Sequence, residues 1–169
     1  MTTSNDNPKV AAILHSIQSS YDALNQLLEG PLSQLDVKRL YEKPASDEWS
    51  LMENLAHINE ILPYWAGEIE KLVATPGQNF GRTQQHAGRL QAIAVHGTDT
   101  LAKAQAELPG GYARLEGVIH TLKDSDLELT GIHPRFGERQ LGWFIEEFVT
   151  THLANHLIQM QTILNAFEK

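Results

Sequence analysis

The chain has 169 residues, 41% of them hydrophobic and 20% charged, which is the composition of an ordinary globular domain. Its formal net charge of -8 at pH 7 makes it a poor electrostatic partner for nucleic acid or for an anionic membrane. The chain has no cysteine, which excludes disulfides, thiolate metal sites and a cysteine nucleophile.

The first helix is predicted to begin at Asn7 and Pro8, since proline is favoured at the first helical position. Apolar residues then recur at spacings of three and four over residues 10–28, which is typical of an amphipathic helix. Gly30 and Pro31 are expected to end this helix, because glycine suits the left-handed C-terminal position and proline cannot continue a helix.

Residues 32–48 are expected to form a connector, with a short helix over residues 35–41. Ser50 and Glu53 then have the spacing of a capping box, in which each side chain satisfies a free backbone amide of the other residue. Apolar residues alternate steps of four and three over residues 51–72, which is the strongest helical pattern in the chain.

Pro63 is expected to kink this second helix, because proline removes one backbone hydrogen bond. The segment "TPGQNFG" at 75–81 predicts a turn, and residues 84–95 are expected to form a short helix. Thr98 or Asp99 is expected to cap the third long helix.

The third long helix is predicted from apolar positions over residues 101–122. "LPGG" at 108–111 should kink or break it. Residues 124–142 are the longest predicted loop, and a fourth long helix follows over residues 141–167.

The predicted fold class is all-α, because no strand pattern is convincing and four long amphipathic segments fit a four-helix bundle. We expect one domain over residues 1–169, with short extra helices in the connections and a flexible segment of about seven residues at the N-terminus. The lengths of the connections allow helices to be neighbours in space without being neighbours in sequence.

His152 and His156 interrupt the apolar row of the fourth helix, in "FVTTHLANHLIQM" at 148–160. Four residues apart on a helix, they lie one above the other and can converge on one ion. The alternative is a pair of neutral core histidines, each bonded to its own acceptor. Leu153 stands where a zinc protease helix of the H-E-x-x-H type carries its glutamate, so protease chemistry is not supported.

A metal site needs at least a third ligand. His57 is one candidate, but it lies on the flank of its helix's apolar stripe, and periodicity alone does not place it in the core. The other candidates are carboxylates and the remaining histidines, which are His15, His86, His96, His120 and His133.

The other histidines favour structural or surface positions. His15 and His120 fall outside the apolar rows of their helices and are expected to face solvent, and His86 and His96 lie in weakly patterned segments. His133 lies in the loop sequence "GIHPRFG", where a role in a turn is favoured over a place near a pocket.

Two residues near His57 also have simple structural interpretations. Glu53 lies one turn before His57 and would suit a carboxylate behind a metal ligand, but its place in the capping box is the favoured interpretation. Trp49 is expected to be a hydrophobic anchor for the start of the helix.

Two segments together resemble the DinB superfamily, namely "EWSLMENLAHINE" and, about a hundred residues later, "THLANHLIQM". The stretch "TLKDSDLELTGIHPRFG" is similar to the family's loop before its last helix. The resemblance implies a DinB-like four-helix bundle that holds a divalent metal, most often nickel or zinc, through three histidines. These fall on His57, His152 and His156.

The resemblance implies two classes of function. The first is a metal-dependent enzyme, such as an S-transferase that uses a low-molecular-weight thiol, or a metal-dependent hydrolase. The second is a non-catalytic bundle that binds a metal or small ligand in a stress-related role. The catalytic residues and the general base stay unassigned, since Glu60, Tyr64 and Asn155 have no signature spacing.

The expected partners are a small-molecule substrate and a second copy of the chain, because members of the family often form homodimers. Neither nucleic acid nor a membrane is expected as a partner. The polar N-terminal segment lacks the order of a signal peptide, and no apolar run reaches the ~18 residues of a membrane span. We therefore expect a cytoplasmic protein.

Overall fold

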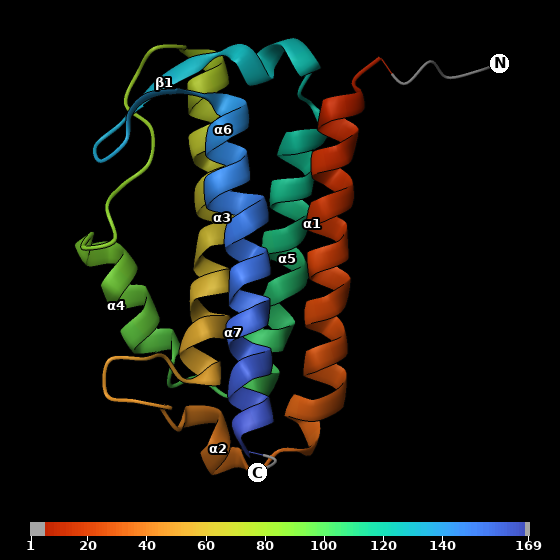
Figure 1. Ribbon diagram of the computed structural model, residues 1–169, viewed down its shortest axis with the longest axis vertical. Helices are drawn as coiled ribbons and strands as arrows, with labels where there is room; N and C mark the ends of the chain where they lie inside the picture. Colours follow the sequence, from red (N-terminus) through yellow and green to blue (C-terminus); the bar gives the residue numbers. More distant parts are fainter. Residues whose placement is uncertain (1–5, 168–169) are drawn as a thin grey trace, which may run out of the picture.

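Four long helices form a bundle in the computed structural model, which describes residues 6–167 (Figure 1). They are α1 (Pro8–Leu27), α3 (Leu51–Ala74), α5 (Leu101–His120) and a fourth helix built from α6 (Leu141–Ile145), a π-helical turn (Glu146–Thr150) and α7 (Thr151–Phe167). The shorter elements are a π-helical turn (Leu28–Leu32), α2 (Val37–Tyr41), α4 (Ala87–His96), a 3-10 helix (Asp124–Glu128), β1 (Thr130–His133) and β2 (Gly137–Gln140). The predicted four-helix bundle is thus confirmed. No helix within residues 6–167 combines the length and apolarity that a membrane crossing requires.

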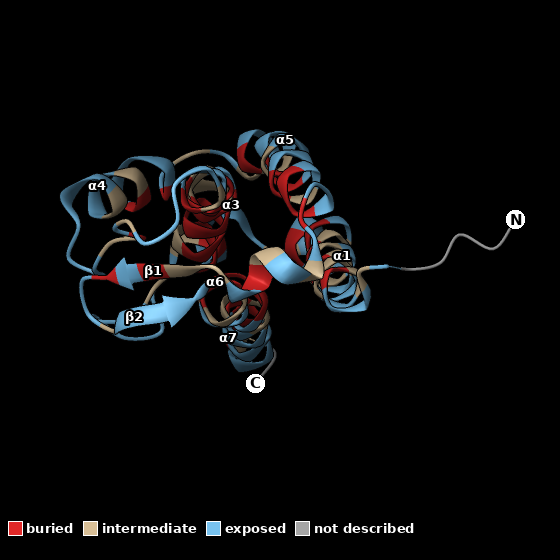
Figure 2. Ribbon diagram, turned by 90° about the horizontal axis from the view of Figure 1, so that it is seen from above, coloured by how far each residue is buried: buried red, intermediate tan, exposed pale blue. Residues whose placement is uncertain are grey.

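Of the long helices, α3 and α5 follow one another in sequence and are neighbours, whereas α1 and α3 follow one another but lie apart. α1 packs against α5 and α7, and α3 packs against the same two helices. Figure 2 shows α1 and α3 at opposite corners, with buried residues turned toward the shared interior. The two diagonal helices are therefore held together by the two that lie between them.

The connection between α3 and α5 runs along the outside of the bundle. Both helices run in the same direction in Figure 1, so residues 75–100 must return past the outer face of α3. This returning segment carries α4, which packs against α3. The topology therefore adds a covering layer on one side of the bundle, and the hairpin of β1 and β2 lies on that same side (Figure 2).

The start of α3 is held by the predicted capping box. The Ser50 hydroxyl accepts a hydrogen bond from the Glu53 amide at 3.1 Å, and the Glu53 carboxylate accepts one from the Ser50 amide at 2.9 Å. The helix then runs through Pro63 to Ala74 without interruption. This capping box holds the first turns of the helix that carries His57.

The first helix begins at Pro8 after Asn7, as predicted, but it is capped differently and does not end as predicted. The side chain of Asn7 does not cap its own helix; instead the Asp124 carboxylate accepts hydrogen bonds from the amides of Lys9 and Val10, at 3.1 and 2.9 Å. At the other end, Gly30 and Pro31 lie inside a π-helical turn.

The helix continues beyond the predicted stop because Leu28 and Leu32 are both buried in the core. Of the N-terminal segment predicted to be flexible, residues 1–5 lie outside the described residues. Within the described part, the Asn7 side chain accepts a hydrogen bond from the Asp124 amide at 2.8 Å.

The third long helix is not broken at "LPGG", and its cap is Thr100 rather than Thr98 or Asp99. Leu108 and Tyr112 on either side are buried in the core. A glycine at position 111 allows α5 to approach α3 closely, since an added Cβ would lie 3.3 Å from the Leu62 side chain. Packing against α3 therefore overrides the local preference of this sequence to break.

The predicted loop over 124–142 contains structure that the sequence pattern did not indicate. β1 and β2 pair antiparallel from Thr130–Gln140 to His133–Gly137. All four residues of β2 are exposed, so its sequence shows no alternation of apolar and polar residues. The expectation of no strands was therefore wrong for this hairpin.

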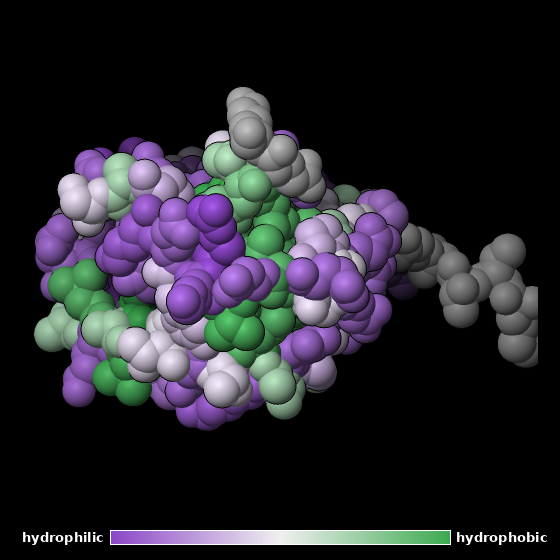
Figure 3. Space-filling view, turned by 90° about the horizontal axis from the view of Figure 1, so that it is seen from below, coloured by the Kyte–Doolittle hydropathy of each residue, from purple (hydrophilic) through white to green (hydrophobic). Residues whose placement is uncertain are grey.

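Exposed apolar residues are spread over several elements. The large ones are Val37, Leu90, Val95, Ile132 and Ile158, from α2, α4, β1 and α7. Figure 3 shows the end of the bundle away from the hairpin, where apolar surface is bordered by hydrophilic residues. Isolated residues of this kind are normal at protein surfaces.

Ser50→Ala should lower the free energy of unfolding by about 1 kcal/mol, because it leaves the Glu53 amide without its cap. Urea unfolding measures the change. Ser16→Ala, at an exposed position within α1, is the matched control and should cost little. Equal effects of the two substitutions would contradict a stabilising role for the capping box.

Candidate metal centre

The bundle brings His57 of α3 together with His152 and His156 of α7. The Nε2 atom of His152 lies 3.0 Å from Nε2 of His57 and 2.9 Å from Nε2 of His156. One ligand atom from each of the three rings lies within 4.8 Å of the other two. Within residues 6–167 this is the only such group of three potential ligands.

His57 is buried although it lies on the flank of the apolar stripe. α3 packs against α4 as well as against α5 and α7, so its buried surface is wider than one stripe. All residues from Asn54 to Ile58 are buried, and His57 is only 1% exposed. Periodicity did not place His57 because α4 is an additional neighbour that the sequence does not show.

Asn54 determines which nitrogen of His156 carries the proton. The Asn54 side-chain amide donates to the Ser50 carbonyl at 2.9 Å, which leaves its oxygen as the acceptor that faces Nδ1 of His156 at 2.9 Å. Nδ1 must therefore be the donor, and Nε2 is left with a lone pair directed at the other two rings. Bonding of this kind behind a ligand holds metal-binding histidines in one orientation.

A carboxylate lies behind His57, at a distance too long for a hydrogen bond. The Glu60 carboxylate lies 3.7 Å from Nδ1 of His57 and also forms an ion pair with Arg82. Nδ1 of His57 has no hydrogen-bond partner among the described residues. The carboxylate behind the cluster is thus Glu60, while Glu53 serves the capping box as expected.

The three rings are uncharged at neutral pH. Burial, followed by the neighbouring rings and arginines, lowers the pKa of His57 to about 2 and that of His156 to about 3. Burial and then Arg89 lower the pKa of His152 to about 4. Neutral imidazoles are the form that binds a metal.

The contacts between the rings fit a metal site better than a set of hydrogen bonds. A neutral Nε2 has either one proton or one lone pair, yet Nε2 of His152 has two Nε2 neighbours within 3.0 Å. Asn54 directs the His156 ring to offer its lone pair there. Three such nitrogens fit nickel, zinc or ferrous iron.

Trp49 is part of this site rather than only an anchor for the helix. Its ring centroid lies 5.0 Å from that of His57 and 5.8 Å from that of His156. The guanidinium of Arg89 lies over the Trp49 ring, 5.2 Å from its centroid. The returning segment thus places the positive charge of the Arg89 guanidinium near the histidines.

Two cavities meet at the histidines. A large one of about 840 Å³ is lined by Trp49 and His156, among others, and a small one of about 130 Å³ is lined by His57. His152 and Arg89 line both cavities. The three rings therefore stand between two spaces, each with a different set of walls.

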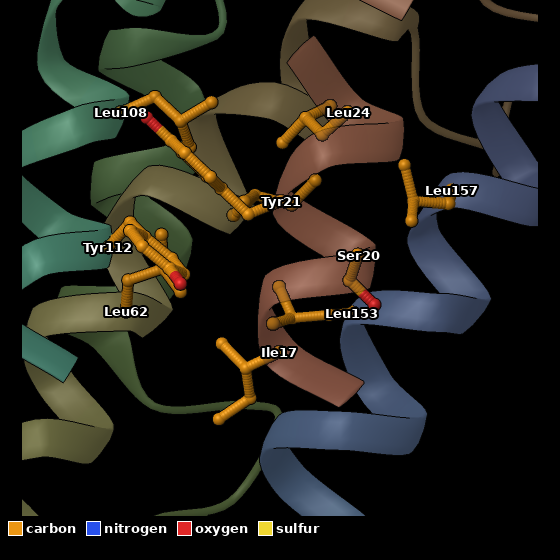
Figure 4. Close-up of a pocket in the computed structure, with 10 residues that line it drawn as sticks. Ile17, Ser20, Tyr21, Leu24, Leu62, Leu108, Tyr112, Leu153 and Leu157 are labelled. Carbon is orange, nitrogen blue, oxygen red and sulfur yellow. The ribbon is translucent and has the colours of Figure 1, made fainter. Parts of the chain in front are cut away.

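A third hollow, lined by residues of α1, α3, α5 and α7, belongs to the core (Figure 4). It measures about 10 Å³, which is room for about one water molecule. The rings of Tyr21 and Tyr112 stack beside it with their centroids 3.9 Å apart. This hollow is a packing gap and offers no space for a substrate.

His133 combines the expected turn role with a place in the wall of the small cavity. Its Nδ1 accepts hydrogen bonds from the amides of Arg135 and Phe136, at 3.1 and 3.4 Å. The side chain is 2% exposed, and it lines the small cavity. Gly81 allows this position, since its φ is +75° and an added Cβ would lie 2.8 Å from the His133 ring.

The remaining histidines lie at the surface. The four residues His15, His86, His96 and His120 are all exposed. His96 contacts the Asp99 carboxylate at 2.8 Å. The predictions of surface positions for these residues are therefore confirmed.

The arginines of the site were not predicted from the sequence. Arg82 and Arg89 come from the returning segment, and Arg135 comes from the turn of the hairpin. Neither segment has a periodic pattern, so only the tertiary fold shows that they meet at the histidines.

Comparison with known proteins identifies the family of this chain. The model of the DinB superfamily matches residues 17–160. The uncharacterized protein YuaE of Bacillus subtilis (strain 168) is 26% identical over 152 residues, which cover 82% of this chain and 91% of that protein.

Two solved structures share the fold. YfiT from Bacillus subtilis, described as a probable metal-dependent hydrolase with an unusual four-helix bundle topology, has a TM-score of 0.78 at 11% identity and covers 99% of this chain and 93% of its own. The mycothiol-dependent maleylpyruvate isomerase has a TM-score of 0.68 at 14% identity. That comparison covers 95% of this chain but only 63% of the isomerase. At these identities the two structures show a common fold.

Asn54→Ala should weaken metal binding about 10- to 100-fold, because His156 loses the acceptor that orients it. Competition with a chromogenic chelator measures the affinity. Asn59→Ala is the matched control on the same helix, since Asn59 bonds the Ala104 carbonyl and not a histidine. Equal affinities of the two variants would contradict the orienting role of Asn54.

The metal-free protein should lose stability as the pH falls from about 6.5 toward 4. The pKa values of the three rings are about 2, 4 and 3 in the folded chain, against an ordinary value of 6.5. The unfolded chain therefore binds more protons over this range, and the free energy of unfolding falls as the pH is lowered, by up to about 1.4 kcal/mol per pH unit for each ring.

Urea unfolding in the presence of a chelator, between pH 7 and pH 5, measures this dependence. His152→Gln should make it shallower, because one titrating ring is removed, and His15→Gln should leave it unchanged. Parallel pH profiles for the wild type and His152→Gln would contradict the lowered pKa of His152.

Proposed function

The chain belongs to the DinB superfamily, and from this premise we propose that it is a metal-dependent enzyme that transfers a low-molecular-weight thiol to an electrophilic small molecule. His57, His152 and His156 would hold the metal, which we expect to be nickel or zinc. The observation that carries the proposal is the position of these three rings between two cavities.

The histidine cluster is suited to an open metal site. Structural metal sites are closed by four protein ligands, whereas catalytic sites keep a position for water or substrate. No fourth histidine or carboxylate from residues 6–167 joins the cluster. Asn54 and Glu60 face the Nδ1 atoms of His156 and His57, on the side of each ring away from Nε2. This arrangement favours an enzyme over the non-catalytic alternative.

The absence of cysteine favours a thiol that arrives from solution, because the chain has no sulfur nucleophile of its own. A divalent ion bound by neutral imidazoles would supply Lewis acidity, which lowers the pKa of a thiol or water molecule beside it.

The large cavity has the size and lining to hold the body of a thiol cofactor. Its volume of about 840 Å³ lies in the range of small-molecule sites. Trp49 and Leu90 offer apolar contacts, while Gln85, Asn155 and Gln159 offer polar groups. The electrophile would then approach from the side of His57, where the small cavity lies.

A metal-dependent hydrolase is the second candidate, and it would use the same cluster with water in place of the thiol. The description of YfiT as a probable metal-dependent hydrolase favours it. The two candidates differ in one measurable property, since the hydrolase needs no added thiol.

His152→Gln should lower the metal content of the purified protein from about one ion per chain and should abolish thiol transfer to 1-chloro-2,4-dinitrobenzene in a screen of small thiols. Elemental analysis and the absorbance of the thioether product measure the two effects. His15→Gln, an exposed substitution on α1, should change neither. Transfer that persists after complete removal of the metal would contradict the proposal.

A further inference from the structure

We propose that the small cavity binds a single carboxylate of the electrophilic substrate and holds it beside His57 and His152. The inference rests on the proposed function, because it names the substrate class for the same site. It follows from the cavity's charges, its walls and its size.

Positive charge is concentrated in this cavity. Arg82, Arg89 and Arg135 all line it, and they are three of the six arginines in a chain whose net charge is -8. Glu147 is the only carboxylate in the lining. A surplus of this sign in an acidic protein favours an anionic ligand.

The charges around the cavity select one negative charge rather than two. Arg82 forms an ion pair with Glu60, which leaves two arginines and Glu147 in the lining and hence a formal surplus of one positive charge. In the part of the chain that the structure describes, neither Arg89 nor Arg135 forms an ion pair. A carboxylate would neutralise this surplus, whereas a phosphate dianion would exceed it.

Arg89 is held in place to act on a ligand. Its guanidinium donates to the Gln84 carbonyl at 2.9 Å and lies over the Trp49 ring. These contacts leave most of its five N–H groups without an assigned acceptor. Burial, followed by repulsion from Arg82, lowers its pKa, which an anion in the cavity would reverse.

His133 contributes a neutral ring to the wall of the same cavity. Because Nδ1 accepts two backbone hydrogen bonds, the proton must lie on Nε2. Burial lowers the pKa of His133, although a hydrogen bond to the Arg82 backbone acts in the opposite direction, so the ring stays neutral. His133 therefore leaves the charge of the cavity to its arginines and Glu147.

The size and walls of the cavity limit the rest of the substrate. A volume of about 130 Å³ is well below the roughly 300–1,000 Å³ of ordinary small-molecule sites, so the cavity suits a carboxylate on a short carbon chain. Trp65, Phe136 and Phe148 form aromatic walls on which a flat, unsaturated carbon chain can pack. The predicted substrate is therefore a small monocarboxylate whose electrophilic carbon lies near the carboxylate.

The test uses two pairs of probes, and each pair consists of a carboxylate and the corresponding uncharged amide. Binding of but-2-enoate and but-2-enamide to the metal-loaded protein is measured by ligand-observed NMR, and thiol transfer is measured with chloroacetate and chloroacetamide. We expect the carboxylate to bind at least about 10-fold more tightly in the wild type. Arg89→Gln and Arg135→Gln should each remove most of this preference.

Arg114→Gln is the matched control, because Arg114 lies on the surface of α5 and pairs with Glu70. Arg135 is exposed, so its substitution keeps the test valid if Arg89→Gln fails to fold. A preference unchanged in Arg135→Gln and Arg89→Gln would overturn the inference, as would tighter binding of inorganic phosphate than of but-2-enoate.

The binding and transfer measurements separate the two proposals. Binding of but-2-enoate that depends on the arginines, without thiol transfer to any probe, would support the carboxylate site and count against the transferase. Transfer to chloroacetamide as fast as to chloroacetate, together with equal binding of the two butenoyl probes, would support the transferase and overturn the carboxylate site.

Discussion

Three imidazole nitrogens lie side by side between α3 and α7, and most other features of the site follow from how their lone pairs are directed. Nε2 of His152 has both other Nε2 atoms within 3.0 Å, and Asn54 turns the His156 ring so that it offers its lone pair there. Such an arrangement is unfavourable without a cation among the rings. Asn54 helps to maintain it by accepting a hydrogen bond from Nδ1 of His156, and the Glu60 carboxylate lies behind His57, so these polar groups are as much part of the site as the rings.

The order of the helices explains why this site has a cover. Because α3 and α5 run in the same direction, residues 75–100 have to return along the outside of α3. This connection places Arg82 and Arg89 beside the histidines, and the turn between β1 and β2 adds Arg135. A bundle with short loops between antiparallel neighbours would have left the same histidines facing solvent or core. The connections thus supply the charge that the helices lack.

The two cavities on either side of the histidines differ in size and in lining. The large one borders His156 and has mixed polar and apolar walls, while the small one borders His57 and has aromatic walls and arginines. His152 and Arg89 stand on the boundary between them. A reaction between two small molecules, one large and polar and the other small and anionic, is the chemistry that this division suits best.

The sequence by itself determined the bundle, the capping box of α3 and the inward direction of His152 and His156, because each rests on local spacing along a helix. Its family resemblance also singled out His57, which periodicity left on the flank of a stripe. The hairpin, the unbroken α5 and the extended end of α1 were decided by tertiary packing, since buried neighbours outweighed local turn signals at Gly30 and at residues 108–111. The arginine cluster was also beyond the sequence, because Arg82 and Arg89 of the α3–α5 connection meet Arg135 of the hairpin turn only once the chain has folded.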